Sequence, residues 1–236
     1  MELPVINHPD YVAKINDDNK FPIKKFGALA DHLLKARVIK KFHIPKECST
    51  KTMQTSHSLK YINHIRNKTL DIKLQKKIGF PINDSVVRRS FVATGGTVLA
   101  SKLALDSKLA CNTAGGSHHA TFSYGAGYCV FNDVAVAANY LKNKGYAKKI
   151  LILDLDVHQG NGNSEIFQND KDVLTFSMHC ASNYPAKKSE SDIDIELKDH
   201  MEDQEYLKVL NDNLNKLNKN KYDFVFYVAG VDIHHE

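Results

Sequence analysis

Four short runs of mostly apolar residues constrain the fold of this 236-residue chain more than any other feature. They span residues 109–113, 149–155, 173–178 and 224–228. Each run is short for a helix and lacks the alternation of a half-exposed strand, so each is predicted to be a strand buried on both faces. Such strands occur in parallel sheets with helices on either side.

Helical patterns lie between these runs. Residues 85–105 carry apolar side chains at helical spacing, and Gly95 with Gly96 falls inside them. The glycine pair indicates either close packing of another backbone or a break in the helix. Further helices are predicted over residues 133–144, ended by Gly145, and near residues 201–217. Without repeats or linkers, the chain is predicted to be a single α/β domain over residues 1–236.

Composition and charge exclude several classes of function. The net charge of +5 comes from scattered lysine pairs rather than a basic patch, so direct nucleic-acid binding is not expected. No run approaches the roughly 20 apolar residues of a membrane span, and the N-terminus does not resemble a secretory signal. The four cysteines include no Cys-x-x-Cys pair, which favours a reducing cytoplasm over a disulfide framework.

Polar residues follow two of the predicted strands. Gly115-Gly116-Ser117-His118-His119 comes after the first, and taken alone such a pair is typical of surface-loop histidines.

The second strand leads into Asp154, Asp156 and His158, which alternation would place on one side of an extended chain. Asp156 and His158 would suit a divalent metal, with Asp154 orienting a neighbour. The alternative is an acidic strand end that caps the next helix. One carboxylate suffices for a cap, and two in an apolar strand are costly without partners, so the metal site is favoured.

Together these motifs resemble the histone deacetylase superfamily, and most closely its bacterial and class IV-like zinc-dependent members. The resemblance extends to Ala-Thr-Gly-Gly-Thr at 93–97, to Gly-Tyr-Cys-Val-Phe-Asn-Asp at 127–133, and to segments 177–179 and 183–194. It covers essentially the whole chain, and several motifs in the same order make chance agreement improbable. The resemblance implies a three-layer, mainly parallel sheet flanked by helices, as in the arginase/deacetylase fold.

The resemblance also implies a role for each motif. Asp156 and His158 would bind one Zn²⁺ per chain, and His118 and His119 would transfer protons. Asp154 would be the partner of His118, and Asn161, where many members carry Asp, the partner of His119. Gln159 replaces a second histidine and is not expected to be a ligand.

Two further features are implied by the resemblance. Tyr128 and Tyr184 would line a narrow tunnel for the acylated side chain, although ordinary packing in an aromatic core explains them equally well. A structural K⁺ would be held by backbone carbonyls and a serine hydroxyl, here Ser177.

The resemblance places the third metal ligand, an Asp, about five residues beyond the position of Asp232. This ligand would be the residue that follows Glu236. The tyrosine that stabilises the oxyanion would lie further on. The chain is therefore expected to be an incomplete, C-terminally truncated deacetylase domain of weak activity, with an exposed sheet edge at residues 224–228. The alternative is that Asp232 or Glu236 serves as the ligand.

The expected function is hydrolysis of acetyl or related acyl groups from lysine side chains or small amines in the cytoplasm. Two alternatives remain. An arginase-like ureohydrolase would need aspartate-rich loops for two manganese ions, which the His118-His119 pair fits poorly. A non-catalytic remnant could bind acyl-lysine without turnover.

Overall fold

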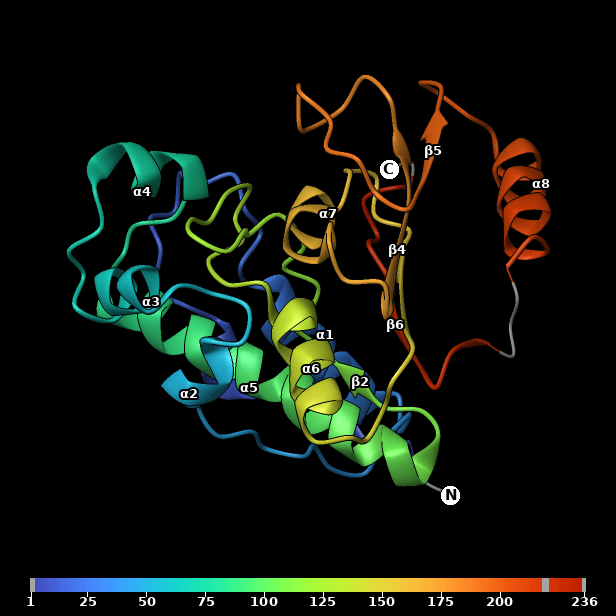
Figure 1. Ribbon diagram of the computed structural model, residues 1–236. Helices are drawn as coiled ribbons and strands as arrows, with labels where there is room; N and C mark the ends of the chain where they lie inside the picture. The colour runs from blue at the N-terminus through green and yellow to red at the C-terminus, as the bar shows by residue number, and fades with distance from the viewer. Residues whose placement is uncertain (1–2, 218–220, 235–236) are drawn as a thin grey trace. The chain divides into compact units, whose positions relative to one another are not determined.

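The computed structural model describes residues 3–217 and 221–234 (Figure 1), which form two compact units, Met1–Tyr146 and Ala147–Glu236. The single domain over residues 1–236 stays a prediction. None of the helices in the described ranges has the length and apolar character needed to cross a membrane. The first unit contains β1 (Val5–Ile6), a 3₁₀ helix (Pro9–Tyr11), α1 (Lys25–Lys35), α2 (Thr50–Met53), α3 (Leu59–Arg66), α4 (Ile72–Ile78), α5 (Asp84–Ser107), β2 (Cys111–Asn112) and α6 (Asp133–Asn143). The second contains β3 (Ile150–Asp154), α7 (Asn161–Phe167), β4 (Val173–Cys180), β5 (Ile193–Leu197), α8 (Asp203–Leu214) and β6 (Phe224–Val228).

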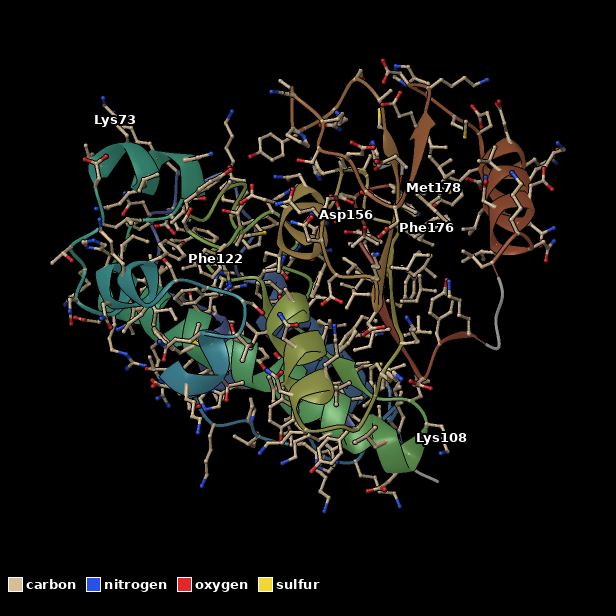
Figure 2. The ribbon with its side chains drawn as sticks, viewed as in Figure 1. Lys73, Lys108, Phe122, Asp156, Phe176 and Met178 are labelled. Atoms are coloured by element: carbon tan, nitrogen blue, oxygen red, sulfur yellow. The ribbon has the colours of Figure 1, made fainter. Side chains whose placement is uncertain are left out.

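The second unit is built on a four-stranded parallel sheet in the order β5-β4-β3-β6. Helix α8 packs on it through Tyr206, Val209 and Leu210, which contact the apolar core around Leu151 and Phe176 (Phe176 is labelled in Figure 2). Helix α7 contacts β4, and Figure 1 shows α7 and α8 on opposite sides of the sheet. This helix-sheet-helix arrangement is the predicted α/β fold class.

Two of the strand predictions need correction. The run at residues 109–113 is not a strand buried on both faces: among the described residues β2 pairs with β1 in a two-stranded sheet, and Leu109 is 61% exposed. β6 lies at the edge of the described sheet, as expected, but only one of its faces is covered: Phe226 and Val228 are buried, whereas Val225 and Tyr227 are exposed. An apolar run shows that a strand is favoured without showing that both of its faces are covered.

Strand β5 was not predicted. Its sequence, Ile-Asp-Ile-Glu-Leu, alternates apolar and acidic residues, as an edge strand with one solvated face does. It pairs in parallel with the end of β4.

Helix α5 forms most of the core of the first unit and runs unbroken through the glycine pair. Its first turn is capped by the Asn83 side chain, which accepts a hydrogen bond from the Val86 amide at 2.9 Å. A Cβ on Gly95 would collide with the backbone carbonyl of Lys46 and lie 3.0 Å from the Cys48 amide nitrogen. The close-packing interpretation is therefore confirmed, and the helix break is excluded.

The buried imidazole of His57 ties α6 to the connection between α2 and α3. Its Nε2 accepts a hydrogen bond from the Asn132 amide at 2.9 Å, so Nδ1 carries the proton and donates to the Thr121 carbonyl, also at 2.9 Å. A charged ring would lose the Nε2 acceptor. Burial accordingly lowers the pKa of His57 to about 4.

Replacing Gly95 by alanine should destabilise the protein by about 1–3 kcal/mol, because the added methyl group meets fixed backbone. Gly27→Ala is the matched control, since Gly27 also lies in a helix and its Cβ would meet only a Val12 methyl at 3.2 Å. The control should shift stability by less than about 1 kcal/mol, in either direction. Urea denaturation measures both. Equal effects of the two changes would contradict the close packing at Gly95.

The folded protein should lose stability as the pH falls through the range between the two pKa values of His57. The unfolded ring takes up a proton near pH 6.5 and the folded ring only near 4, so acid favours unfolding in this window. Between pH 7 and 5 the loss from this group is about 2 kcal/mol. Urea denaturation should show that His57→Asn reduces the pH dependence by this amount, while Gln168→Asn, an exposed change that removes no titratable group, leaves it unchanged. An unchanged dependence in His57→Asn would contradict the assignment.

Candidate active site

The chain bends directly after β3, instead of continuing as the predicted extended segment. The strand ends at Asp154, and residues 156–158 form a bend. The Asp156 carboxylate stabilises it by accepting a hydrogen bond from the His158 amide at 2.9 Å, while the His158 Nδ1 lies 2.9 Å from the same oxygen. Short acidic side chains favour such turns because they bind backbone amides two residues on. Asp156 and His158 thus meet through a turn and not through strand alternation.

Asp232 joins this pair from the segment after β6. One potential ligand atom each from Asp156, His158 and Asp232 lies within 4.8 Å of the others. Parallel pairing places Asp154 beside Val228, so the segments that follow both strands leave the same edge of the sheet. Gly230 allows their close approach, since a Cβ there would lie 2.7 Å from the Asp156 Cα.

Two carboxylates surround the His158 ring and favour its protonated form. Hydrogen bonds to Asp156 and Asp232, the latter at 3.1 Å from Nδ1, raise the pKa of His158 to about 9. Asp232 is further fixed by the Val157 amide, which donates to its Oδ1 at 3.2 Å. Two carboxylates and one imidazole that converge in this way could hold a divalent cation such as Zn²⁺. The other alternative ligand, Glu236, lies outside the described residues.

Asp154 lies buried at the end of β3. Its carboxylate accepts hydrogen bonds from the Asp156 amide at 3.2 Å and from the Asn163 side chain at 3.4 Å. A buried carboxylate needs such partners to offset its lost hydration. Asn161, the first residue of α7, is also buried. The pairings of Asp154 with His118 and of Asn161 with His119 stay predictions.

His118 and His119 are both buried, which rules out surface-loop histidines. Their rings lie 4.1 Å apart, centroid to centroid. The loop just before them is held by the buried Asp133, which accepts hydrogen bonds from the Gly116 and Ser117 amides at 3.1 and 2.7 Å. The pair therefore sits in the interior on a loop of defined conformation.

The other end of the histidine loop is held by Asn132. Its side chain donates to the Ala120 carbonyl at 3.2 Å and caps α6 by accepting from the Ala135 amide at 2.9 Å. The backbone amide of Asn132 donates to the His57 Nε2. The Asn132-Asp133 step at the start of α6 thus fixes both sides of the histidine pair.

The two predicted tunnel tyrosines have different surroundings. Tyr184 is 37% exposed, and its ring lies 6.3 Å from the His158 ring in an edge-on arrangement. Tyr128 packs against Phe21 and Phe80 at 5.1 and 5.3 Å in the core of the first unit, and its φ of 62° is unusual for a residue with a side chain. Core packing is observed for Tyr128, and a tunnel role stays a prediction for both.

Ser177 is buried in β4. Its hydroxyl accepts a hydrogen bond from the Gly160 amide at 3.3 Å and lies 3.0 Å from the His179 Nδ1. Its role at a structural potassium ion stays a prediction.

Several residues of structural importance were not identified from the sequence. Asp133 lies within a motif that carried the resemblance and follows the Asn that caps α6, but a cap signals only the start of a helix and not its burial. His57 gave no signal, because a single histidine in a polar segment is most often exposed. Asp232 was weighed as a ligand, but only the strand register brings it to Asp156 and His158.

Comparison with known proteins identifies the family of the chain. The histone deacetylase domain family matches residues 20–236. An uncharacterized protein of Picosynechococcus is 44% identical over 99% of this chain and 79% of its own length. Histone deacetylase 2 of Arabidopsis thaliana is 28% identical over 90% of this chain, and acetoin utilization protein AcuC of Staphylococcus aureus is 26% identical over 94%. The chain spans only 58% and 63% of the lengths of these last two proteins.

Solved structures give the same result for the fold. The HDA15 HD domain superposes with a TM-score of 0.81 at 20% identity, covering 99% of this chain and 73% of that one. An HDAC homolog complexed with SAHA also gives 0.81, at 26% identity, over 91% of this chain and 64% of that one. The chain therefore belongs to the histone deacetylase family and has its α/β fold, with a parallel sheet flanked by helices.

Proposed function

We propose that this protein is a zinc-dependent deacetylase, which hydrolyses the amide bond of acylated lysine side chains or acylated small amines. The observation that carries the proposal is the convergence of Asp156, His158 and Asp232 beyond the carboxyl ends of β3 and β6. Membership of the histone deacetylase family supports a hydrolase of this type. The substrate class is inferred from the family and from the implied tunnel.

The donor set at this site fits zinc, which binds carboxylate oxygen and imidazole nitrogen in catalytic centres that keep one position open. Asp156 and His158 would hold one ion per chain, with a carboxylate such as Asp232 as the third ligand. A bound zinc ion would polarise the acyl carbonyl and lower the pKa of the attacking water. Ser177 would contribute to a separate structural potassium site.

His118 and His119 would handle the protons of the reaction. Amide hydrolysis requires a base that takes a proton from the attacking water and an acid that protonates the leaving amine. If Asp154 is the partner of His118, its negative charge favours the protonated ring there. The neutral Asn161 would leave His119 less cationic, which suits it to accept a proton.

Two other functions have weaker support. A ureohydrolase of the arginase type would need a second cluster of acidic ligands, whereas the one group of three that converges in residues 3–217 and 221–234 includes a histidine and suits a single ion. A non-catalytic acyl-lysine binder would keep the pocket without turnover, and an activity assay separates it from the deacetylase. The proposed cytoplasmic location accords with four cysteines that form no disulfide within the described residues.

The intact protein, supplied with zinc, should hydrolyse a fluorogenic acetyl-lysine peptide, and His119→Ala should lower kcat by about 10²–10⁴-fold. KM should change much less, because proton transfer is felt mainly in the transition state. His32→Ala replaces an exposed histidine of α1 and is the control, with kcat expected at the parent value. Hydrolysis by His119→Ala at the parent rate would refute the role of the histidine pair. Zinc-loaded parent protein that binds the peptide without cleaving it would favour the non-catalytic binder.

A further inference from the structure

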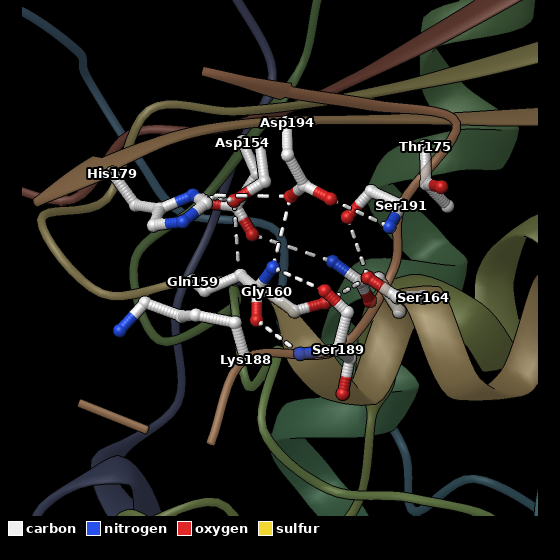
Figure 3. Close-up of polar contacts among 12 residues, drawn as sticks. Asp154, Gln159, Gly160, Ser164, Thr175, His179, Lys188, Ser189, Ser191 and Asp194 are labelled. Carbon is white, nitrogen blue, oxygen red and sulfur yellow. Dashed lines mark hydrogen bonds and ion pairs between the residues drawn. The ribbon is translucent and has the colours of Figure 1, made fainter. Parts of the chain in front are cut away.

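The side chain of Gln159 is buried, and its amide makes three hydrogen bonds (Figure 3). Its Nε2 donates to the Ser189 carbonyl at 2.7 Å and to Asp194 Oδ1 at 2.9 Å, and its Oε1 accepts from the Ser189 amide at 2.8 Å. The primary amide thus pairs in both directions with the backbone of one residue and uses its second N–H for a carboxylate. The side chain at this position must therefore supply two N–H donors and one oxygen acceptor, as a primary amide does.

The segment that Gln159 contacts connects β4 to β5 and carries Tyr184. Residues 181–191 form no helix or strand, so their conformation depends on side-chain and loop contacts. Lys188 braces the turn from within by donating to the carbonyls of Asn183 and Pro185 at 2.5 and 2.8 Å. The backbone amide of Gln159 adds a hydrogen bond to the Tyr184 carbonyl at 3.2 Å.

Asp194 anchors the other side of this contact to the sheet. It lies in β5, and its Oδ2 accepts a hydrogen bond from the Ser191 amide at 2.7 Å. Gln159 therefore links three parts of the unit: the bend with Asp156 and His158, the connecting segment, and a strand of the sheet. Figure 3 shows Gln159, Ser189 and Asp194 joined by dashed lines.

We propose that Gln159 is a positioning residue, whose amide holds the segment 181–191 against the bend of the candidate metal site and so fixes Tyr184 beside His158. Gln159 follows His158 directly in the chain, so movement of this segment and of the imidazole is coupled through one residue. The consequence for catalysis rests on the proposed function, but the contact itself can be tested without any activity.

Native-state proteolysis with trypsin tests the contact, because Lys187 and Lys188 lie in the held segment. In Gln159→Leu, a side chain of similar size without polar atoms, cleavage after these lysines should be roughly tenfold faster, since lost hydrogen bonds favour local opening. Gln168→Leu alters an exposed glutamine at the end of α7 and should be cleaved at the parent rate. Mass spectrometry identifies the cut sites, and a thermal melt shows whether each variant is folded.

Two further variants, Gln159→Glu alone and Gln159→Glu combined with Asp194→Asn, test the contact if Gln159→Leu fails to fold. Gln159→Glu places a carboxylate against Asp194 and should also speed cleavage. Adding Asp194→Asn restores a donor opposite an acceptor, so the double variant should return part of the way to the parent rate. If Gln159→Glu is cleaved at the parent rate, or if Asp194→Asn brings no recovery, the positioning role is wrong.

Kinetics of acetyl-lysine hydrolysis then separate positioning from general destabilisation. A displaced Tyr184 should raise KM more than it lowers kcat, and the double variant should recover KM. If the variants are cleaved faster but the parent protein has no hydrolase activity, the inferred contact of Gln159 stands and the proposed function is wrong. Normal cleavage and KM in active Gln159→Glu would overturn the positioning role alone.

Discussion

The parallel pairing of β3 with β6 is the constraint on which the candidate metal site depends. It places Asp154 beside Val228, so the bend after β3 and the segment after β6 leave the sheet at the same edge. The two segments are far apart in the sequence, yet Gly230 lets them approach closely enough for Asp232 to reach His158. Ligands in open parallel sheets bind at such an edge because the strand ends leave polar groups there that no neighbour covers.

The apolar runs predicted the sheet well where helices cover it and less well at its margins. β3 and β4 lie where predicted because their mostly apolar sequences suit burial on both faces. The run at residues 109–113, Leu-Ala-Cys-Asn-Thr, is less apolar and pairs with β1 instead, since composition does not say which strand will be the neighbour. β5 was missed because its alternating acids suit solvent as well as a sheet edge.

The candidate site, like the sheet, could be predicted from the sequence only in part. Asp156 and His158 lie close together, but the backbone between them turns because Asp156 binds the His158 amide, and their role as metal ligands stays a prediction. The resemblance marked His118 and His119, and the structure adds the groups that hold them, above all Asp133 and Asn132. Contacts such as that of Gln159 with Ser189 depend on tertiary pairing and leave no local pattern in the sequence.

X-ray absorption at the zinc edge of the zinc-loaded protein, together with its zinc content, tests the metal site most directly. We expect one zinc per chain with nitrogen and oxygen ligands at about 2.0–2.2 Å, and loss of the ion when Asp156 and His158 are both replaced by alanine. A variant with the exposed His32 and Asp212 replaced should retain the ion. Sulfur ligands at a zinc–sulfur distance of about 2.3 Å would contradict the assignment of the metal site, as would full zinc content in the Asp156→Ala, His158→Ala protein.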